Sequence, residues 1–390
     1  QSWLDGSQKE EKVKQILFEV KQKKNEIEMI NSECNDIRLD LETKLQKGLL
    51  GVEFWNNWQL LQEKQEDIIH LDEDCMQEYQ RALIYSSDVI DVYRGLIELE
   101  YKEYLDALTD MNYRGIKKIW KRICMYLEML PLKEQRYWEN LRLVDSSSLY
   151  TQKIRGIAVD RIVPEMEVLK KIQQKQWVSI IGMAGIGKTH LAWLVSSKWC
   201  KHQEIELVFC DVSSCAILDL LVTTLSQHFN ISCLEASPQE FLIEEIVERG
   251  ECVLIIDNAE NLSKECILLL EEMVRSCPEL TLIVTSRRSL GSELENSYQL
   301  PFMSYVEGLE LFVSQAKRRR VDWSLTQENC SHLLNIIEGL DRLPLALKLA
   351  AGRISELSLK EINKRLKKDS AVLIDGGCFK EGETLQAALG

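Results

Sequence analysis

An apolar run, a glycine-rich loop and a helical pattern follow one another near the middle of the chain, and this feature most constrains the fold. Residues 177–181 have the composition of a buried strand, and residues 190–196 have the pattern of a helix. The loop between them, Gly182-Met-Ala-Gly-Ile-Gly-Lys188-Thr189, fits the motif G-x-x-x-x-G-K-[ST]. Its glycines let backbone N–H groups turn inward around phosphate oxygens, and the helix that follows points its positive end at the anion. The feature therefore predicts a strand, a phosphate-binding loop and a helix.

The loop also predicts roles for single residues. Lys188 supplies a mobile positive charge for the outer phosphates of a nucleotide, and Thr189 supplies a hydroxyl for Mg²⁺. His190 is expected to flank the helix, because phosphoryl transfer of this kind depends mainly on positioning and charge. The residues of this segment that are expected to bind nucleotide are Met183, Ala184, Gly185, Ile186, Gly187, Lys188, Thr189 and His190.

Two further apolar runs end in charged residues. Residues 253–256 lead directly to Asp257, and residues 282–284 are followed, after two hydroxyl side chains, by Arg287 and Arg288. Ligands bind at the carboxyl ends of strands in open α/β sheets, so Asp257 is expected to hold Mg²⁺ directly or through water. An arginine after the second strand can reach the γ-phosphate and report its presence.

Three regions differ in composition along the chain. Residues 1–148 are rich in Glu, Lys, Gln and Leu, which predicts an all-α bundle or coiled coil. Residues 149–302 alternate strand and helix patterns, and residues 303–382 are helical again. The predicted fold class is therefore α/β, with the parallel sheet of a P-loop NTPase between an N-terminal all-α domain and a small C-terminal helical subdomain. The expected strands are 178–181, 206–211, 252–257, 280–285 and a short one near Tyr298.

The N-terminal region allows two interpretations. Apolar residues recur between positions 13 and 41 at alternating three- and four-residue steps, a heptad stripe that only Lys23 interrupts, and a second long helix is expected to follow. One interpretation is a self-contained antiparallel bundle whose stripes face its own core. The other is a coiled-coil interaction surface, which is favoured by the single lysine in the seam and by Trp55, Trp58 and Trp120, three tryptophans expected to be exposed.

Composition limits the partners and the location. The 390 residues carry a net charge of -14, which argues against nucleic acid as the main partner. A basic run, Lys317-Arg-Arg-Arg320, is interpreted as a solvated helix face. The 12 cysteines are scattered without a C-x-x-C pair and there are 5 histidines, so buried thiols in a reducing compartment are expected. Neither a signal peptide nor an apolar run long enough to span a bilayer is present, and the cytoplasm is the expected location.

Four motifs together resemble a known family. They are the loop 182–189, Leu254-Ile-Ile-Asp-Asn-Ala-Glu260, Thr285-Ser-Arg287 and Leu343-Pro-Leu-Ala-Leu347. Over residues 154–389 their order and spacing resemble the NB-ARC, or AP-ATPase, group of STAND NTPases. This group includes apoptosome scaffolds, immune receptors and bacterial regulators. The residues within the motifs are more similar to those of bacterial members than to those of plant members. The resemblance implies an ADP-locked, ATP-opened switch that oligomerises in defence or cell-death-like signalling. It also implies that residues 303–382 form an ARC1-like subdomain and that 383–390 begin a truncated winged-helix domain.

The resemblance assigns further residues of the site. Asp257 corresponds to the Walker B acid, which holds the metal together with Thr189, and Arg287 rather than Arg288 corresponds to the γ-phosphate sensor. Pro344 is expected to pack against the bound nucleotide. The loop before the first strand is expected to cover the adenine through Val159, Asp160 and Arg161.

Two positions depart from the family pattern. Asn258 stands where many relatives have a second acid, and an amide cannot take a proton at neutral pH. Glu260 is the nearest substitute, so Asp257 and Glu260 are the candidate catalytic residues. Arg342 replaces the glycine that usually precedes the Leu-Pro pair. We therefore expect binding of ADP or ATP with Mg²⁺ and, at most, a weak ATPase activity.

Other functions stay open at this point. The chain is also compatible with a STAND-type transcriptional regulator whose DNA-binding part is absent from it, or with a helical interaction scaffold regulated by nucleotide. A motor-type ATPase would require fast hydrolysis, against which Asn258 counts. The expected partners are adenine nucleotide and either other proteins or further copies of the chain, bound through the N-terminal helices and the nucleotide-binding domain.

Overall fold

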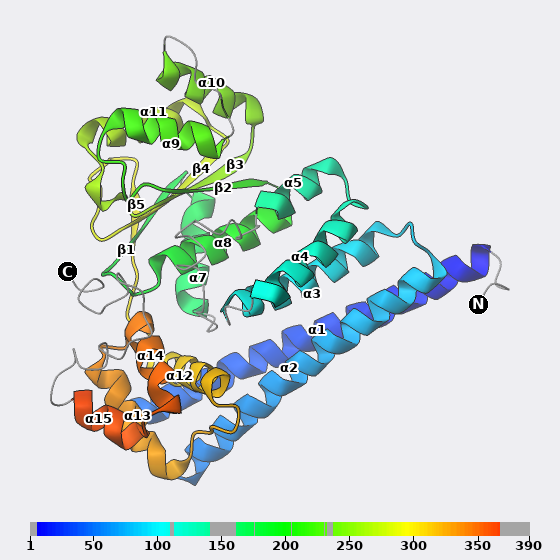
Figure 1. The fold of residues 1–390 in the computed structure, drawn as a ribbon, viewed down its shortest axis with the longest axis vertical. Coiled ribbons are helices and arrows are strands. Elements are labelled where there is room, and N and C mark those ends of the chain that lie inside the picture. Colours follow the sequence, from blue (N-terminus) through cyan, green and yellow to red (C-terminus); the bar gives the residue numbers. More distant parts are fainter. Residues whose placement is uncertain are drawn as a thin grey trace. The chain divides into compact units, whose positions relative to one another are not determined.

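The computed structural model describes residues 6–109, 113–140, 161–174, 176–203, 205–229, 231 and 237–366. The chain divides into two compact units, Gln1–Gln135 and Arg136–Gly390. The described part of the first unit is wholly helical, whereas the second combines a parallel sheet, the helices that cover it and a group of C-terminal helices (Figure 1). Within these described ranges, no helix has the length and apolar character needed to cross a membrane.

The first two helices form an antiparallel hairpin. α1 (Gly6–Gln46) and α2 (Val52–Tyr85) are joined by a short turn and lie side by side (Figure 1). Side-chain hydrogen bonds join Asn57 to Asp40 (2.6 Å) and Lys23 to Asp74 (3.0 Å), so residue numbers rise along one helix as they fall along the other. The fully buried residues of the heptad stripe on α1 are Val13, Ile16, Val20, Cys34 and Leu41.

A core shared by three helices supports the bundle interpretation of this unit. The hairpin is followed by α3 (Ile90–Thr109), α4 (Tyr113–Leu127) and α5 (Leu132–Asn140). Buried side chains of α1, α2 and α3 form one apolar cluster: Ile16, Val20, Cys75, Tyr79, Ala82, Val92 and Leu96. Ile16 and Val20 of the apolar stripe are therefore packed against helices of their own unit.

Two tryptophans differ from the expectation that they are exposed. Trp58 lies on the apolar face of α2, one turn after Phe54, and both are buried. Trp120 is buried with its ring centroid 5.1 Å from that of Tyr104, and Trp55 is half-buried. The prediction of exposed indole rings was therefore wrong for Trp58 and Trp120, because helical spacing turns these two side chains toward the core of the bundle.

The second unit is built on a five-stranded parallel sheet with the strand order β2-β3-β4-β1-β5. Its strands are β1 (Trp177–Ile181), β2 (Glu206–Asp211), β3 (Cys252–Asp257), β4 (Leu280–Ser286) and β5 (Asn296–Gln299). These bounds agree with the strands expected from the apolar runs. β4 lies between β1 and β3, so the loops after these three strands meet at one edge of the sheet. The predicted fold class is confirmed.

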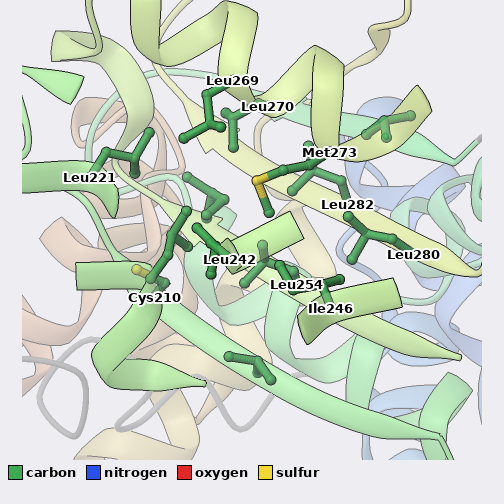
Figure 2. Close-up of a cluster of buried hydrophobic side chains, with 14 of the residues drawn as sticks. Cys210, Leu221, Leu242, Ile246, Leu254, Leu269, Leu270, Met273, Leu280 and Leu282 are labelled. Carbon is green, nitrogen blue, oxygen red and sulfur yellow. The ribbon is translucent and has the colours of Figure 1, made fainter. Parts of the chain in front are cut away.

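Hydrophobic packing holds the strands in this order. The covering helices are α7 (Ile162–Gln174), α8 (Lys188–Gln203), α9 (Leu218–His228), α10 (Pro238–Arg249) and α11 (Lys264–Ser276). α9, α10 and α11 cover one face of the sheet, and α7 and α8 lie on the other (Figure 1). Figure 2 shows Leu270 and Met273 of α11 in the same cluster as Leu254 of β3 and Leu282 of β4. This core fixes where the strand ends lie.

Local sequence signals mark where two of the C-terminal helices begin. The group consists of α12 (Tyr305–Arg319), α13 (Gln327–Gly339), α14 (Pro344–Ala351) and α15 (Leu359–Leu366), with the short 3-10 helix η2 (Gly352–Ser355) between the last two. Another 3-10 helix, η1 (Ala259–Asn261), follows β3. Pro344 occupies the first position of α14, where its missing N–H costs nothing. The N–H of Glu361 donates to Ser358 (3.3 Å) and the N–H of Ser358 donates to Glu361 (3.0 Å), which together form a capping box at the start of α15. The boundaries of residues 149–302 and 303–382 remain predictions, and residues 383–390 lie outside the described part.

We predict that the core in Figure 2 carries much of the stability of the second unit. Leu270 is 0% exposed, so Leu270→Ala should lower the free energy of unfolding by about 2–5 kcal/mol through lost burial and a residual cavity. Leu268 on the same helix is 61% exposed, and Leu268→Ala is the matched control, with an expected change within about 0.5 kcal/mol. Urea unfolding of both variants measures the difference, and equal losses would contradict the assignment of the core.

Candidate nucleotide-binding site

The loop between β1 and α8 has the conformation that its glycines predict. Gly185 and Gly187 have φ values of 76° and 98°, in the region that side chains disfavour. The N–H of Gly182 donates to the carbonyl of Ser286 at the end of β4 (3.2 Å), and a Cβ at Gly182 would lie 3.1 Å from Ile186. The glycines are therefore required by backbone shape and by close packing, and the loop is anchored to the neighbouring strand.

The side chains of the loop divide into those that pack and those that are predicted to bind a ligand. Ile186 is buried and packs under the loop, whereas Met183 is exposed and Ala184 is half-buried. The ammonium of Lys188 donates to the carbonyls of Gly182 (2.8 Å) and Met183 (3.0 Å), which holds its charge over the loop. α8 begins at Lys188, so the positive end of its dipole also lies here, with His190 in the first turn.

The two predicted metal ligands lie together. The hydroxyl of Thr189 donates to Oδ1 of Asp257 at 2.6 Å, although 68 residues separate them along the chain. Asp257 is the last residue of β3 and is 0% exposed. A hydroxyl and one carboxylate are hard oxygen ligands, and Mg²⁺ binds nucleotides with such a set completed by phosphate oxygens and water. The residues present therefore fit Mg²⁺.

Thr285 belongs to the same cluster and was missed as a site residue by sequence reasoning. Its hydroxyl donates to Oδ1 of Asp257 (2.6 Å) and accepts from the N–H of Asn258 (3.1 Å). Thr285 is buried one residue before the end of β4, the strand next to β3. A hydroxyl residue near the carboxyl end of an apolar run is the signal that could have identified it.

Asp211 is a second residue that the sequence analysis missed. It ends β2 and is paired in register with Asp257 on β3. Its Oδ1 accepts from the side-chain amide of Asn258 (2.9 Å) and from the N–H of Ser213 (2.8 Å), and the same amide nitrogen also donates to Oδ2 of Asp257 (2.9 Å). Residues 206–211 were expected as a strand, and its terminal acid was the available signal.

The predicted sensor and the predicted base are paired with each other. Nε of Arg287 lies 3.2 Å from Oε1 of Glu260, which stands in the short helix η1. Arg288 also reaches this segment, where its guanidinium donates to the carbonyl of Glu260 at 3.5 Å. The carboxylate of Glu260 is therefore paired with an arginine. It is not part of the hydrogen bond between Thr189 and Asp257.

The C-terminal helices contact the loop directly. The N–H of Leu345 in the first turn of α14 donates to the carbonyl of Gly185 at 3.3 Å, and the neighbouring Pro344 is buried. Arg342 has a φ of 55°, a left-handed conformation that glycine adopts freely. This conformation explains why glycine is the residue of the NB-ARC pattern at this position. The guanidinium of Arg342 lies 5.2 Å from the ring centroid of Tyr305, within the range of a cation–π contact.

The side chain of Arg161 donates hydrogen bonds to main-chain carbonyls. Its guanidinium is buried and donates to the carbonyls of Pro301 (2.8 Å) and Phe302 (3.0 Å), and it lies 3.6 Å from the carboxylate of Glu307. Burial lowers the pKa of Arg161, and the charge of Glu307 opposes that shift. These contacts favour a role in holding the segment between β5 and α12 over the expected contact with adenine. Val159 and Asp160 lie outside the described residues.

Comparison with known proteins supports the class of this site. Residues 176–319 match the model of the NACHT domain, a family of STAND NTPases. Proteins of Mycobacterium bovis and Mycobacterium tuberculosis that are provisionally named HTH-type transcriptional regulators are 27% identical over 221 residues, covering 56% of this chain and 25% of each relative. Uncharacterized proteins of the same species are 26% identical over 197 residues, covering 50% of either chain. The chain thus spans about a quarter of the length of the first group.

Two solved structures show more distant likeness. C. elegans PCH-2 has a TM-score of 0.36 and 16% identity, covering 60% of this chain and 71% of its own. Domain III of the Thermotoga maritima replication initiation protein DnaA has a TM-score of 0.36 and 15% identity, covering 61% and 98%. The NACHT match and the geometry of the site support a STAND-class NTPase that binds nucleotide, whereas the NB-ARC subgroup remains a prediction.

We predict that the hydroxyl of Thr285 stabilises the fold through Asp257. Thr285→Val keeps the shape of the side chain but removes a donor to a buried carboxylate, so the free energy of unfolding should fall by about 1–3 kcal/mol. Thr281→Val on the same strand is the control, because Thr281 lies away from this cluster. Chemical unfolding of both variants provides the measurement. Similar changes in the free energy of unfolding of the two variants would show that the hydrogen bond from Thr285 to Asp257 does not stabilise the fold.

Proposed function

We propose that this chain is a nucleotide-dependent molecular switch of the NB-ARC type, which holds ADP in a closed state and opens when ATP replaces it. One observation carries the proposal: the phosphate loop is hydrogen-bonded to the C-terminal helices through Gly185 and Leu345, at 3.3 Å. A loop that responds to the number of phosphates can bias the position of α14 through this contact. The extent of opening is limited by the difference between the affinities of the two states for each nucleotide.

The junction between the sheet and the C-terminal helices also suits a switch. Arg161 fixes the carbonyls of Pro301 and Phe302, and Ser304 with Glu307 forms a capping box at the start of α12. The connection is therefore short and anchored on its sheet side. Motion of the C-terminal helices would pivot after this anchor, so that the contact with the phosphate loop opens or closes as a unit.

Arg287 is proposed as the sensor of the γ-phosphate. Its guanidinium follows β4, the strand between the phosphate loop and Asp257, and its present partner is the carboxylate of Glu260. A γ-phosphate offers a stronger, more highly charged acceptor for the same guanidinium. Exchange of partners by Arg287 would then distinguish ATP from ADP.

Slow hydrolysis follows from the same arrangement. Asn258 stands next to the Walker B acid, and its amide cannot take a proton at neutral pH, while Glu260 becomes available as a base only after Arg287 has moved from it to the γ-phosphate. A general base must be free to take a proton from the attacking water. We therefore propose Asp257 and Glu260 as the acids of a weak ATPase, with nucleotide exchange rather than turnover setting the state of the switch.

Signalling by assembly is the proposed output. The family resemblance supports oligomerisation in defence or cell-death-like responses, through the nucleotide-binding domain and the N-terminal helices. A reducing compartment such as the cytoplasm is proposed because the chain buries several thiols. Burial raises the pKa of Cys200 and of Cys252 to about 12, which keeps these groups protonated and unreactive at neutral pH.

A second candidate is a nucleotide-regulated transcription factor, favoured by the names of the mycobacterial relatives. In that case the switch would control a DNA-binding part of the same protein. A mobility-shift assay on protein that includes such a part, with duplex DNA in ADP and in a non-hydrolysable ATP analogue, separates the candidates. Nucleotide-dependent DNA binding would favour the regulator, whereas assembly without DNA binding would favour the signalling switch.

The central test combines nucleotide content with native mass. The purified protein is denatured, the released nucleotide is identified, and the mass of the native protein is measured in ADP and in the ATP analogue. We expect ADP to be released from a monomer that assembles in the analogue. A monomer in both nucleotides, or fast steady-state turnover, would refute the switch.

We predict that Lys188→Arg removes nucleotide retention. The guanidinium is larger and planar, and it cannot place a compact charge over the loop as the ammonium does. Lys198→Arg on the same helix is the control, since Lys198 pairs with Glu165 at the surface. Chromatography of the nucleotide released from each purified variant measures occupancy. Full occupancy in Lys188→Arg would make the phosphate-loop assignment wrong.

We also predict that Arg287→Ala separates the two nucleotides. Loss of a charge-assisted hydrogen bond should raise the Kd for ATP roughly tenfold or more and the Kd for ADP less than about twofold. Arg288→Ala is the matched control and should change neither value. Titration with fluorescent nucleotides provides the constants. Equal weakening of ATP and ADP would remove the sensor role from Arg287.

A further inference from the structure

We propose that Asp211 is the second acid of the nucleotide site, a positioning residue that acts on the Walker B acid through the side-chain amide of Asn258. The inference rests on the proposed function only in assuming that Asp257 and Thr189 hold Mg²⁺ beside a nucleotide. It explains why the position after Asp257 is an amide and where the missing second carboxylate lies. That carboxylate is supplied by β2, the strand next to β3.

The geometry places one amide between two carboxylates. Nδ2 of Asn258 lies 2.9 Å from Oδ1 of Asp211 and 2.9 Å from Oδ2 of Asp257. An amide nitrogen carries two hydrogens, so each carboxylate receives one. Asp211 and Asp257 are register partners at the ends of adjacent parallel strands, and both are buried. Two buried negative charges repel each other, and the shared amide offsets that repulsion.

The backbone is shaped to make this bridge. Asn258 has φ 63° and ψ 49°, a left-handed conformation that asparagine tolerates better than most residues. The same turn directs the N–H of Asn258 to the hydroxyl of Thr285 at 3.1 Å. Asp211 is fixed in turn by the N–H of Ser213 at 2.8 Å. The bridge is therefore held from both ends by backbone donors.

The bridge fixes the orientation of the carboxylate of Asp257. Oδ1 accepts from the hydroxyls of Thr189 and Thr285, both at 2.6 Å, and Oδ2 accepts from the amide of Asn258. With its two oxygens occupied by different donors, the carboxylate cannot rotate without breaking one of these bonds. Oδ1 consequently faces Thr189, the other predicted metal ligand. Groups behind a metal ligand commonly alter metal affinity ten- to a hundredfold.

An acid at position 258 would disrupt this arrangement. A carboxylate there would donate no hydrogen bond and would add a third negative charge between Asp211 and Asp257. The amide and the acid on β2 thus form a matched pair, in which Asp211 holds Asn258 and Asn258 holds Asp257.

The test measures metal dependence separately from nucleotide binding. A fluorescent ATP analogue is bound to the full chain while Mg²⁺ is titrated, and ADP binding is measured in EDTA. Asp211→Ala should raise the Mg²⁺ concentration for half-maximal binding about tenfold, and ADP binding without metal should change less than about twofold. Asp211→Asn keeps an acceptor for the amide and should recover most of the loss. Asp219→Asn, an exposed acid in the first turn of α9, is the control.

The pairing of Asp211 with Asn258 is tested by combining variants. If both act on Asp257 through one bridge, Asn258→Ala should cause a similar shift, and the double variant should be no worse than either single variant. Three results would overturn the inference: wild-type Mg²⁺ dependence in Asp211→Ala, additive losses in the double variant, or equal weakening of metal-free ADP. The last would indicate a general structural defect. Failure of the switch itself would instead appear as absence of assembly in the unmodified chain.

Discussion

A buried carboxylate is the constraint on which the arrangement of this site depends. Asp257 is 0% exposed, and an ionised carboxylate inside a protein is tolerated only where hydrogen bonds replace its water. The donors come from Thr189 at the start of α8, Thr285 near the end of β4 and Asn258 after β3. These segments are far apart in sequence, so satisfying one side chain requires that the phosphate loop and two strands come together in a single geometry.

Sequence patterns identified the elements more reliably than their spatial partners. The apolar runs at 178–181 and 252–257 gave the strands, because burial on both faces of a parallel sheet demands continuous apolar composition. The insertion of β4 between them was not predicted, since periodicity carries no information on which strands pair. Asp211 was missed for that reason: a strand-terminal acid is common, and only its neighbour in the sheet gives it a role.

The surroundings of individual side chains were harder to predict where the partner is distant. Arg161 was assigned to adenine by resemblance, which stays a prediction, and sequence reasoning did not foresee that its guanidinium donates to carbonyls some 140 residues further along the chain. Trp58 and Trp120 were expected at the surface, although helical spacing places both on buried faces. In contrast, the contacts of Lys188 with the carbonyls of Gly182 and Met183 follow from the local motif, because donor and acceptors belong to the same short loop.

The hydrogen bond between the phosphate loop and α14 joins two main-chain groups, the carbonyl of Gly185 and the N–H of Leu345. Such a contact is indifferent to the side chains on either side of it. Substitutions in α14 can alter how tightly the helix packs without deleting the bond, and only a proline at position 345, which has no N–H, would remove it. Substitutions in α14 can therefore change the strength of this contact in small steps, while the hydrogen bond itself is retained because both of its groups belong to the main chain.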